Sequence, residues 1–174
     1  HRRPRLEDTG ARRVEFLTGY QNRRYADDYL AFVNRVRAAE AALGSSDHFS
    51  QAVARNLFKL MAYKDEYEVA RLHTDPAFTA HIRERFEGDY KLQHHLAPPL
   101  WARRGPDGQP VKRAYGPWMR QAFTVLARLR GLRGTPFDPF GYAEERRTER
   151  ALIATYRERI ESLLPGLQPH NLAL

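Results

Sequence analysis

The sequence predicts a mainly α-helical fold, and three observations support this prediction. Apolar residues recur at the three- and four-residue spacing of a helix over five stretches of the chain. Glycine, proline and capping residues stand where these stretches would begin or end. The 174 residues, 42% of them apolar, suffice for one domain with a core. We expect a single helical domain of about five helices, with a small extended or hairpin insertion around residues 89–116.

The first two predicted helices occupy about residues 14–43 and 49–72. Gly44 is a natural C-terminal stop for the first helix. Ser46 or Asp47 is expected to cap the second helix, because short polar side chains accept hydrogen bonds from free amides at a helix start.

Three shorter patterns complete the predicted fold. A capping threonine and aspartate before Pro76 predict a third helix, which stops at Gly88. Between Gly116 and Gly131 a fourth helix is expected to turn four apolar side chains inward, namely Trp118, Phe123, Leu126 and Leu129. Residues 131–142 are irregular but too apolar for a solvated linker, so we expect them to pack against the helices. A fifth helix follows over about residues 143–164.

Three charged residues interrupt the apolar face of the helix predicted around residues 54–72. At about 100° per residue, Lys64, Glu68 and Arg71 fall in the middle of that face. A buried charge is costly unless it is paired and hydrogen-bonded. The spacings i,i+4 and i,i+3 allow these side chains to pair. We predict a paired ionic network at the margin of the core; the alternative is direct contact with another domain.

The net charge of +8 is concentrated in two segments, residues 1–24 and 103–133. The second segment has eight lysines or arginines and Asp107 as its one acid. Such a segment favours an acidic partner. The candidate partner surface consists of Arg103, Arg104, Lys112 and Arg113.

The sequence offers no catalytic, cofactor-binding or metal-binding constellation. Cysteine is absent, which excludes thiolate ligands and a cysteine nucleophile within this chain. The seven histidines show no metal-binding spacing. Adjacent carboxylates at Asp65-Glu66 do not converge on one substrate atom, so a solvated or salt-bridged surface is expected there. No apolar run has the length of a membrane span or the character of a signal peptide, which predicts a cytoplasmic protein.

Six segments, in the same order, resemble one family. They are RRVEFLTGYQN (12–22), VARNLFKLMAYKDEYEVARL (53–72), FEGDYKLQHHLAPPL (86–100), GPWMRQAF (116–123), LRGTPFDPFGY (132–142) and ERRTERALI (145–153). Together they resemble the C-terminal domain of the long, fused bacterial indolepyruvate ferredoxin oxidoreductases. The resemblance covers about residues 12–174. Residues 1–11 are then expected to be a linker or vector-derived.

The resemblance implies a parent enzyme that oxidatively decarboxylates aryl 2-oxoacids to acyl-coenzyme A. Thiamine diphosphate, an iron–sulfur cluster, coenzyme A and ferredoxin are implied for that parent. The motifs that hold the cofactors belong to other parts of it, so no functional residue is carried over to this chain. We expect an accessory domain, non-catalytic by itself, that packs on the catalytic domains or docks acidic ferredoxin.

Three other functions remain open at this point. The basic segment could hold the phosphates of coenzyme A, or the chain could be a nucleic-acid-binding module. Nucleic acid is the less favoured partner, because few aromatic residues interleave with the bases. An independent enzyme ranks last, since the catalytic constellation that it needs is not found.

Overall fold

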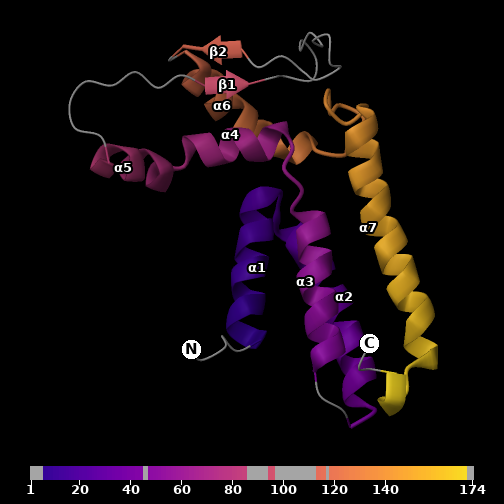
Figure 1. Cartoon of the computed structure of the whole chain (residues 1–174). Coiled ribbons are helices and arrows are strands. Elements are labelled where there is room, and N and C mark those ends of the chain that lie inside the picture. The colour runs from indigo at the N-terminus through magenta and orange to yellow at the C-terminus, as the bar shows by residue number, and fades with distance from the viewer. Residues whose placement is uncertain (1–5, 45–46, 86–93, 97–112, 117, 172–174) are drawn as a thin grey trace. The chain divides into compact units, whose positions relative to one another are not determined.

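The computed structural model describes residues 6–44, 47–85, 94–96, 113–116 and 118–171 (Figure 1). As predicted, the described chain is mainly α-helical. Within these ranges seven α-helices replace the five expected, because two of the predicted helices are each divided. The helices are α1 (Leu6–Tyr20), α2 (Arg23–Ala41), α3 (His48–Met61), α4 (Glu66–Thr74), α5 (Pro76–Arg85), α6 (Met119–Arg128) and α7 (Glu144–Leu163).

The shorter elements lie in the second half of the chain. Strand β1 (His94–Leu96) pairs antiparallel with β2 (Arg113–Tyr115), with His94 opposite Tyr115, inside the insertion that the sequence predicts. The short 3₁₀ helices are η1 (Leu129–Leu132), η2 (Leu164–Gly166) and η3 (Pro169–Asn171).

The chain divides into two compact units. Unit 1 consists of residues 1–63 and 147–174, and unit 2 consists of residues 64–146. Unit 2 is therefore one continuous segment of the sequence that follows α3 and ends within the first turn of α7.

Unit 1 buries one hydrophobic core among α1, α2, α3 and α7. Its largest buried apolar residues are Leu17, Tyr29, Phe32, Leu57 and Met61, with Ile160 from α7. Three tyrosine hydroxyls satisfy carbonyls of α3 and of the residues that follow it: Tyr20 bonds Tyr63 O, Tyr25 bonds Met61 O, and Tyr29 bonds Ala54 O. Aromatic rings thus supply apolar area while their polar ends remain bonded.

The predicted helix 14–43 is divided at Asn22. This residue has an extended backbone, and its side chain accepts a hydrogen bond from Tyr25 N at 2.9 Å, so α2 starts anew. The sequence pattern did not indicate this break, because the apolar periodicity continues on both sides of Asn22.

A glutamate from α2 caps α3. Asp47 is the N-cap residue, as predicted, but its side chain makes no capping hydrogen bond. The buried carboxylate of Glu40 instead accepts hydrogen bonds from Phe49 N at 3.0 Å and Ser50 N at 2.8 Å. A carboxylate at a helix N-terminus also interacts favourably with the helix dipole.

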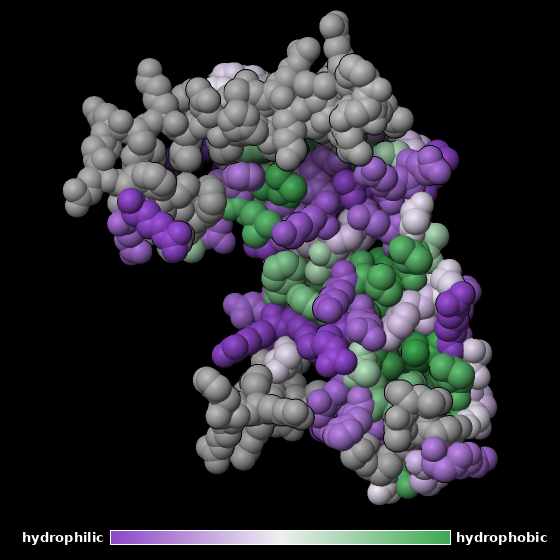
Figure 2. Space-filling view, viewed as in Figure 1, coloured by the Kyte–Doolittle hydropathy of each residue, from purple (hydrophilic) through white to green (hydrophobic). Residues whose placement is uncertain are grey.

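Unit 2 is built on the packing of α4 against α6. Ala70, Met119 and Phe123 form its buried apolar cluster, and the His73 ring stacks on Phe123 at 5.2 Å between ring centres. Phe123 faces inward as predicted, whereas the expectation for Trp118 and Leu129 is wrong, because both side chains are exposed. Hydrophobic residues thus also reach the surface among strongly hydrophilic ones (Figure 2).

Candidate functional site: an ionic cluster at the start of α4

The ionic cluster begins where the predicted helix 49–72 breaks. Helix α3 ends at Met61, and Asp65 caps α4 with an extended backbone and a 2.9 Å bond from Glu68 N to its side chain. The prediction of one continuous helix is wrong, because the capping aspartate satisfies an amide that a continuous helix would bond to a carbonyl. Lys64 lies in the connection, is exposed, and forms no ion pair with another described residue.

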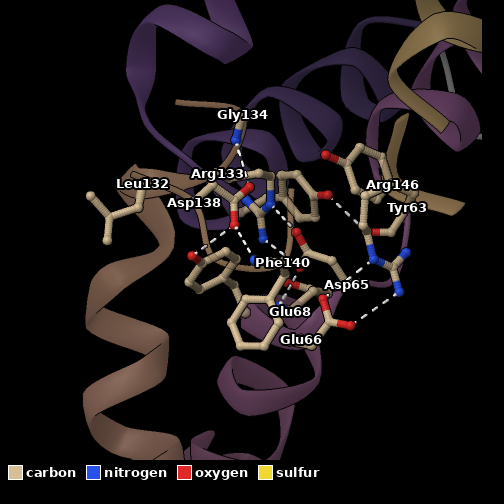
Figure 3. Close-up of polar contacts among 12 residues, drawn as sticks. Tyr63, Asp65, Glu66, Glu68, Leu132, Arg133, Gly134, Asp138, Phe140 and Arg146 are labelled. Carbon is tan, nitrogen blue, oxygen red and sulfur yellow. Dashed lines mark hydrogen bonds and ion pairs between the residues drawn. The ribbon is translucent and has the colours of Figure 1, made fainter. Parts of the chain in front are cut away.

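Four successive residues from Asp65 to Glu68 each contact a different side chain. Figure 3 shows Asp65 beside Arg133 and Glu66 beside Arg146. Asp65 pairs with Arg133, Glu66 with Arg146 and Glu68 with Arg71, while the Tyr67 hydroxyl donates to Asp138. We call this set the ionic cluster; its members are Asp65, Glu66, Tyr67, Glu68, Arg71, Arg133, Asp138 and Arg146. All eight lie in unit 2.

The central pair joins Asp65 to Arg133. The guanidinium donates Nε to one carboxylate oxygen and Nη2 to the other, the second bond being 2.9 Å long. Asp65 and Arg133 are 3% and 4% exposed. Arg133 Cζ also lies 5.5 Å from the centre of the Tyr67 ring. A bidentate geometry is what offsets the cost of removing two charges from water.

Asp138 organises the turn that follows Arg133. Its buried carboxylate accepts hydrogen bonds from Gly134 N at 2.9 Å, Phe140 N at 3.1 Å and the Tyr67 hydroxyl at 3.1 Å. Burial raises the pKa of Tyr67, and the negative charge of Asp138 raises it further. Tyr67 therefore remains a neutral donor to Asp138 at neutral pH.

The two outer pairs are less buried. Glu66 lies 3.3 Å from Arg146 Nε, and both side chains are about one-eighth exposed. Burial raises the pKa of Glu66 more than Arg146 lowers it. Glu68 holds Arg71 through two bonds of 2.8 Å, and those bonds raise the pKa of the guanidinium.

The predicted network of Lys64, Glu68 and Arg71 is thus present in part. Glu68 and Arg71 pair as the i,i+3 spacing indicates, whereas Lys64 does not belong to the pair. The surface predicted at Asp65-Glu66 is salt-bridged, but these acids are buried or nearly so. The sequence analysis did not identify Arg133 and Asp138 as members of the cluster. Their one distinguishing feature in the sequence is that they are charged residues within an apolar, glycine- and proline-rich segment.

The predicted partner surface falls largely outside the described part of the chain. Arg103, Arg104 and Lys112 are not among the described residues. Arg113 begins β2, and its side chain is not described either.

Chemically, the ionic cluster consists of three ion pairs and of Asp138, a carboxylate held by neutral donors. Each carboxylate in it accepts a hydrogen bond from an arginine, a tyrosine or a backbone amide. Among the described residues, no group of three or more histidines and acids could hold a metal ion. Nor does any helix in these ranges have the length and apolar character to cross a membrane.

The fold and the cluster define a mainly helical protein in which one four-residue segment ties several distant segments of unit 2 together. The chain belongs to DUF6537, a family of unknown function whose model matches residues 6–174. Comparison with curated proteins and with solved structures gave no match.

Proposed function

We propose that the chain is an accessory domain, non-catalytic by itself, of a cytoplasmic indolepyruvate ferredoxin oxidoreductase that acts on aryl 2-oxoacids. The six segments of resemblance support the parent's identity. The observation that supports an accessory role is the pairing of the ionic cluster, which commits the carboxylates of Asp65, Glu68 and Asp138 to holding unit 2 together. Carboxylates used in this way contribute to structure rather than to proton transfer.

In the parent, thiamine diphosphate would supply the decarboxylation chemistry, and coenzyme A would accept the acyl group. An iron–sulfur cluster does not fit this chain, because its ligands are cysteine thiolates and the chain has no cysteine. This domain's contribution would be to pack on the catalytic domains.

The proposal is tested with the parent enzyme purified with and without this domain. We expect loss of the domain to weaken assembly or thermal stability of the enzyme, and the 174-residue chain added in trans to restore it. If the shortened enzyme is unchanged and does not bind the chain, the accessory role is wrong.

The second form of the proposal is docking of acidic ferredoxin on the basic segment. Reversing the charges of Arg103, Arg104, Lys112 and Arg113 should raise the KM for ferredoxin and leave an artificial electron acceptor unaffected, because steering by charge acts on the charged partner alone. An equal response of both acceptors would contradict docking at these residues.

A further inference from the structure

Residues 133–142 form a loop that is fastened at several points, which we call the clasped loop. Arg133 anchors its start to Asp65, and Asp138 anchors its middle to Tyr67. The Tyr142 hydroxyl donates to Pro136 O at 2.7 Å, which joins the end of the loop to its middle. These contacts hold the loop in one conformation.

The backbone of the clasped loop is also closed by successive turns. Thr135 N, Asp138 N and Gly141 N each donate to the carbonyl three residues earlier, at 2.9–3.2 Å. Gly134 has φ +74°, a region that favours glycine. A side chain at Gly141 would place its Cβ 2.8 Å from Asp138 Oδ2, so glycine is needed for this close approach.

The clasped loop presents apolar side chains to solvent instead of burying them. Phe137 is 81% exposed and Tyr142 is 60% exposed. Pro136 and Pro139, on either side of Phe137 and Asp138, are exposed too. The prediction that residues 131–142 pack inward is therefore wrong for Phe137 and Tyr142, whereas Phe140 does pack, with its ring edge-on to Tyr67 at 5.4 Å.

A rigid loop that exposes a phenylalanine is suited to binding. Exposed aromatic area gains free energy when a partner covers it, and aromatic residues dominate protein interfaces for this reason. Two prolines and the buried Asp138 have already fixed the loop, so little conformational entropy remains to be lost on binding.

The chemistry next to the loop favours a protein as the partner. Glu144 and Glu145 follow Tyr142 closely and are both exposed. Arg147, which is also exposed, follows them, so the surface beside the loop carries both signs of charge and is not the positive surface that the phosphates of a nucleic acid or an anionic membrane favour. A bare aromatic ring beside a mixed-charge surface instead matches a concave apolar pocket with a polar rim.

We propose that the clasped loop is the docking element of this domain, and that Phe137 inserts into an apolar pocket on the catalytic part of the same enzyme. This inference rests on the proposed function, which supplies the partner, and it assigns the contact to residues that the function alone does not specify.

The test is calorimetric titration of the full chain into the parent enzyme purified without this domain. Phe137→Ala should weaken binding by about tenfold to a hundredfold, because it removes a central aromatic anchor. Phe137→Leu, which keeps apolar volume, should retain most of the affinity. The control is Leu152→Ala, a truncation of another exposed apolar side chain, on α7, which should bind as the unaltered chain does.

The outcomes separate the two proposals. If the unaltered chain binds and Phe137→Ala binds equally well, the docking loop is wrong and the accessory role stands. If the unaltered chain does not bind the enzyme, the accessory role itself fails. Phe137-dependent binding to vesicles containing phosphatidylserine, or a Phe137-dependent dimer in sedimentation, would also overturn the assignment of the partner. Circular dichroism should show that Phe137→Ala remains folded, since the side chain is exposed.

Discussion

The guanidinium of Arg133 forms two hydrogen bonds with the carboxylate of Asp65, 68 positions earlier in the chain, and both side chains are buried. The same carboxylate caps α4 through Glu68 N. One aspartate therefore connects the start of a helix, a buried cation and the base of the clasped loop.

Removing Arg133 should destabilise the protein strongly. Arg133→Met leaves the buried Asp65 carboxylate without its cation, which costs about 3–5 kcal/mol in comparable buried pairs. Urea unfolding followed by far-ultraviolet circular dichroism measures the change. The matched control is Arg23→Met, which breaks an exposed pair with Asp27 and should cost less than about 1 kcal/mol. Equal losses in the two variants would contradict a structural role for the buried pair.

Replacing Glu66 should change the dependence of stability on pH. The folded protein raises the pKa of Glu66, so the folded chain retains this proton to higher pH than the unfolded chain. The stability that this proton contributes is complete below pH ~4.5 and is lost as pH rises through the folded pKa. Glu66→Gln does not titrate. The free energy of unfolding of the unaltered chain, relative to Glu66→Gln, should therefore be higher at pH 4 than at pH 7.

This comparison is made by urea unfolding of both proteins at the two pH values. Glu145→Gln, at an exposed acid, provides the control for replacing a carboxylate in the same region. A difference that grows between pH 4 and pH 7 would show that the ion pair with Arg146 outweighs burial, and a constant difference would show that the two effects cancel; either result would contradict the prediction.

Alanine should be tolerated at Gly131, just before the clasped loop, but should destabilise the protein at Gly134 inside it. Gly134 has φ +74°, where a side chain costs about 1–2 kcal/mol, so Gly134→Ala should lower the free energy of unfolding by about this amount. Gly131, three residues earlier, has no positive φ, and apart from its immediate chain neighbours and the local helix backbone no atom lies within 4 Å of the position that a Cβ would occupy there. Gly131→Ala should be neutral or slightly stabilising. Thermal melts of the two variants would contradict this reasoning if both changed alike.

Replacing Glu40 should lower the free energy of unfolding, although the sequence pattern does not single this residue out. Glu40→Ala removes the carboxylate that accepts hydrogen bonds from two N-terminal amides of α3, and bonds to charged groups contribute about 1.5–3 kcal/mol each. We expect a loss of at least about 2 kcal/mol in urea unfolding. Glu158→Ala, at an exposed acid on α7, serves as a comparison and should cost less. Retention of full stability by Glu40→Ala would indicate that water or Asp47 replaces the cap.

Helix content was predictable because periodicity is a local signal. Pro76 starts α5, and the last pattern gives α7, as expected. The breaks at Asn22 and Asp65 were not predicted, although each is a good capping residue. Apolar periodicity continues across both positions, so a pattern read at 3.6 residues per turn joins the helices into one.

The sequence by itself determined the mainly helical class, the lack of cysteine in this chain and the charges of residues 64–71. Only the tertiary structure decided which of those charges pair and where. Arg133 and Asp138 lie 68 and 71 positions from their partners Asp65 and Tyr67, and local spacing carries no information about contacts at that separation. The apolar character of Phe137 predicts that its ring packs in the core. The tertiary structure instead keeps this ring exposed, because the hydrogen bonds that close the clasped loop direct it away from the core.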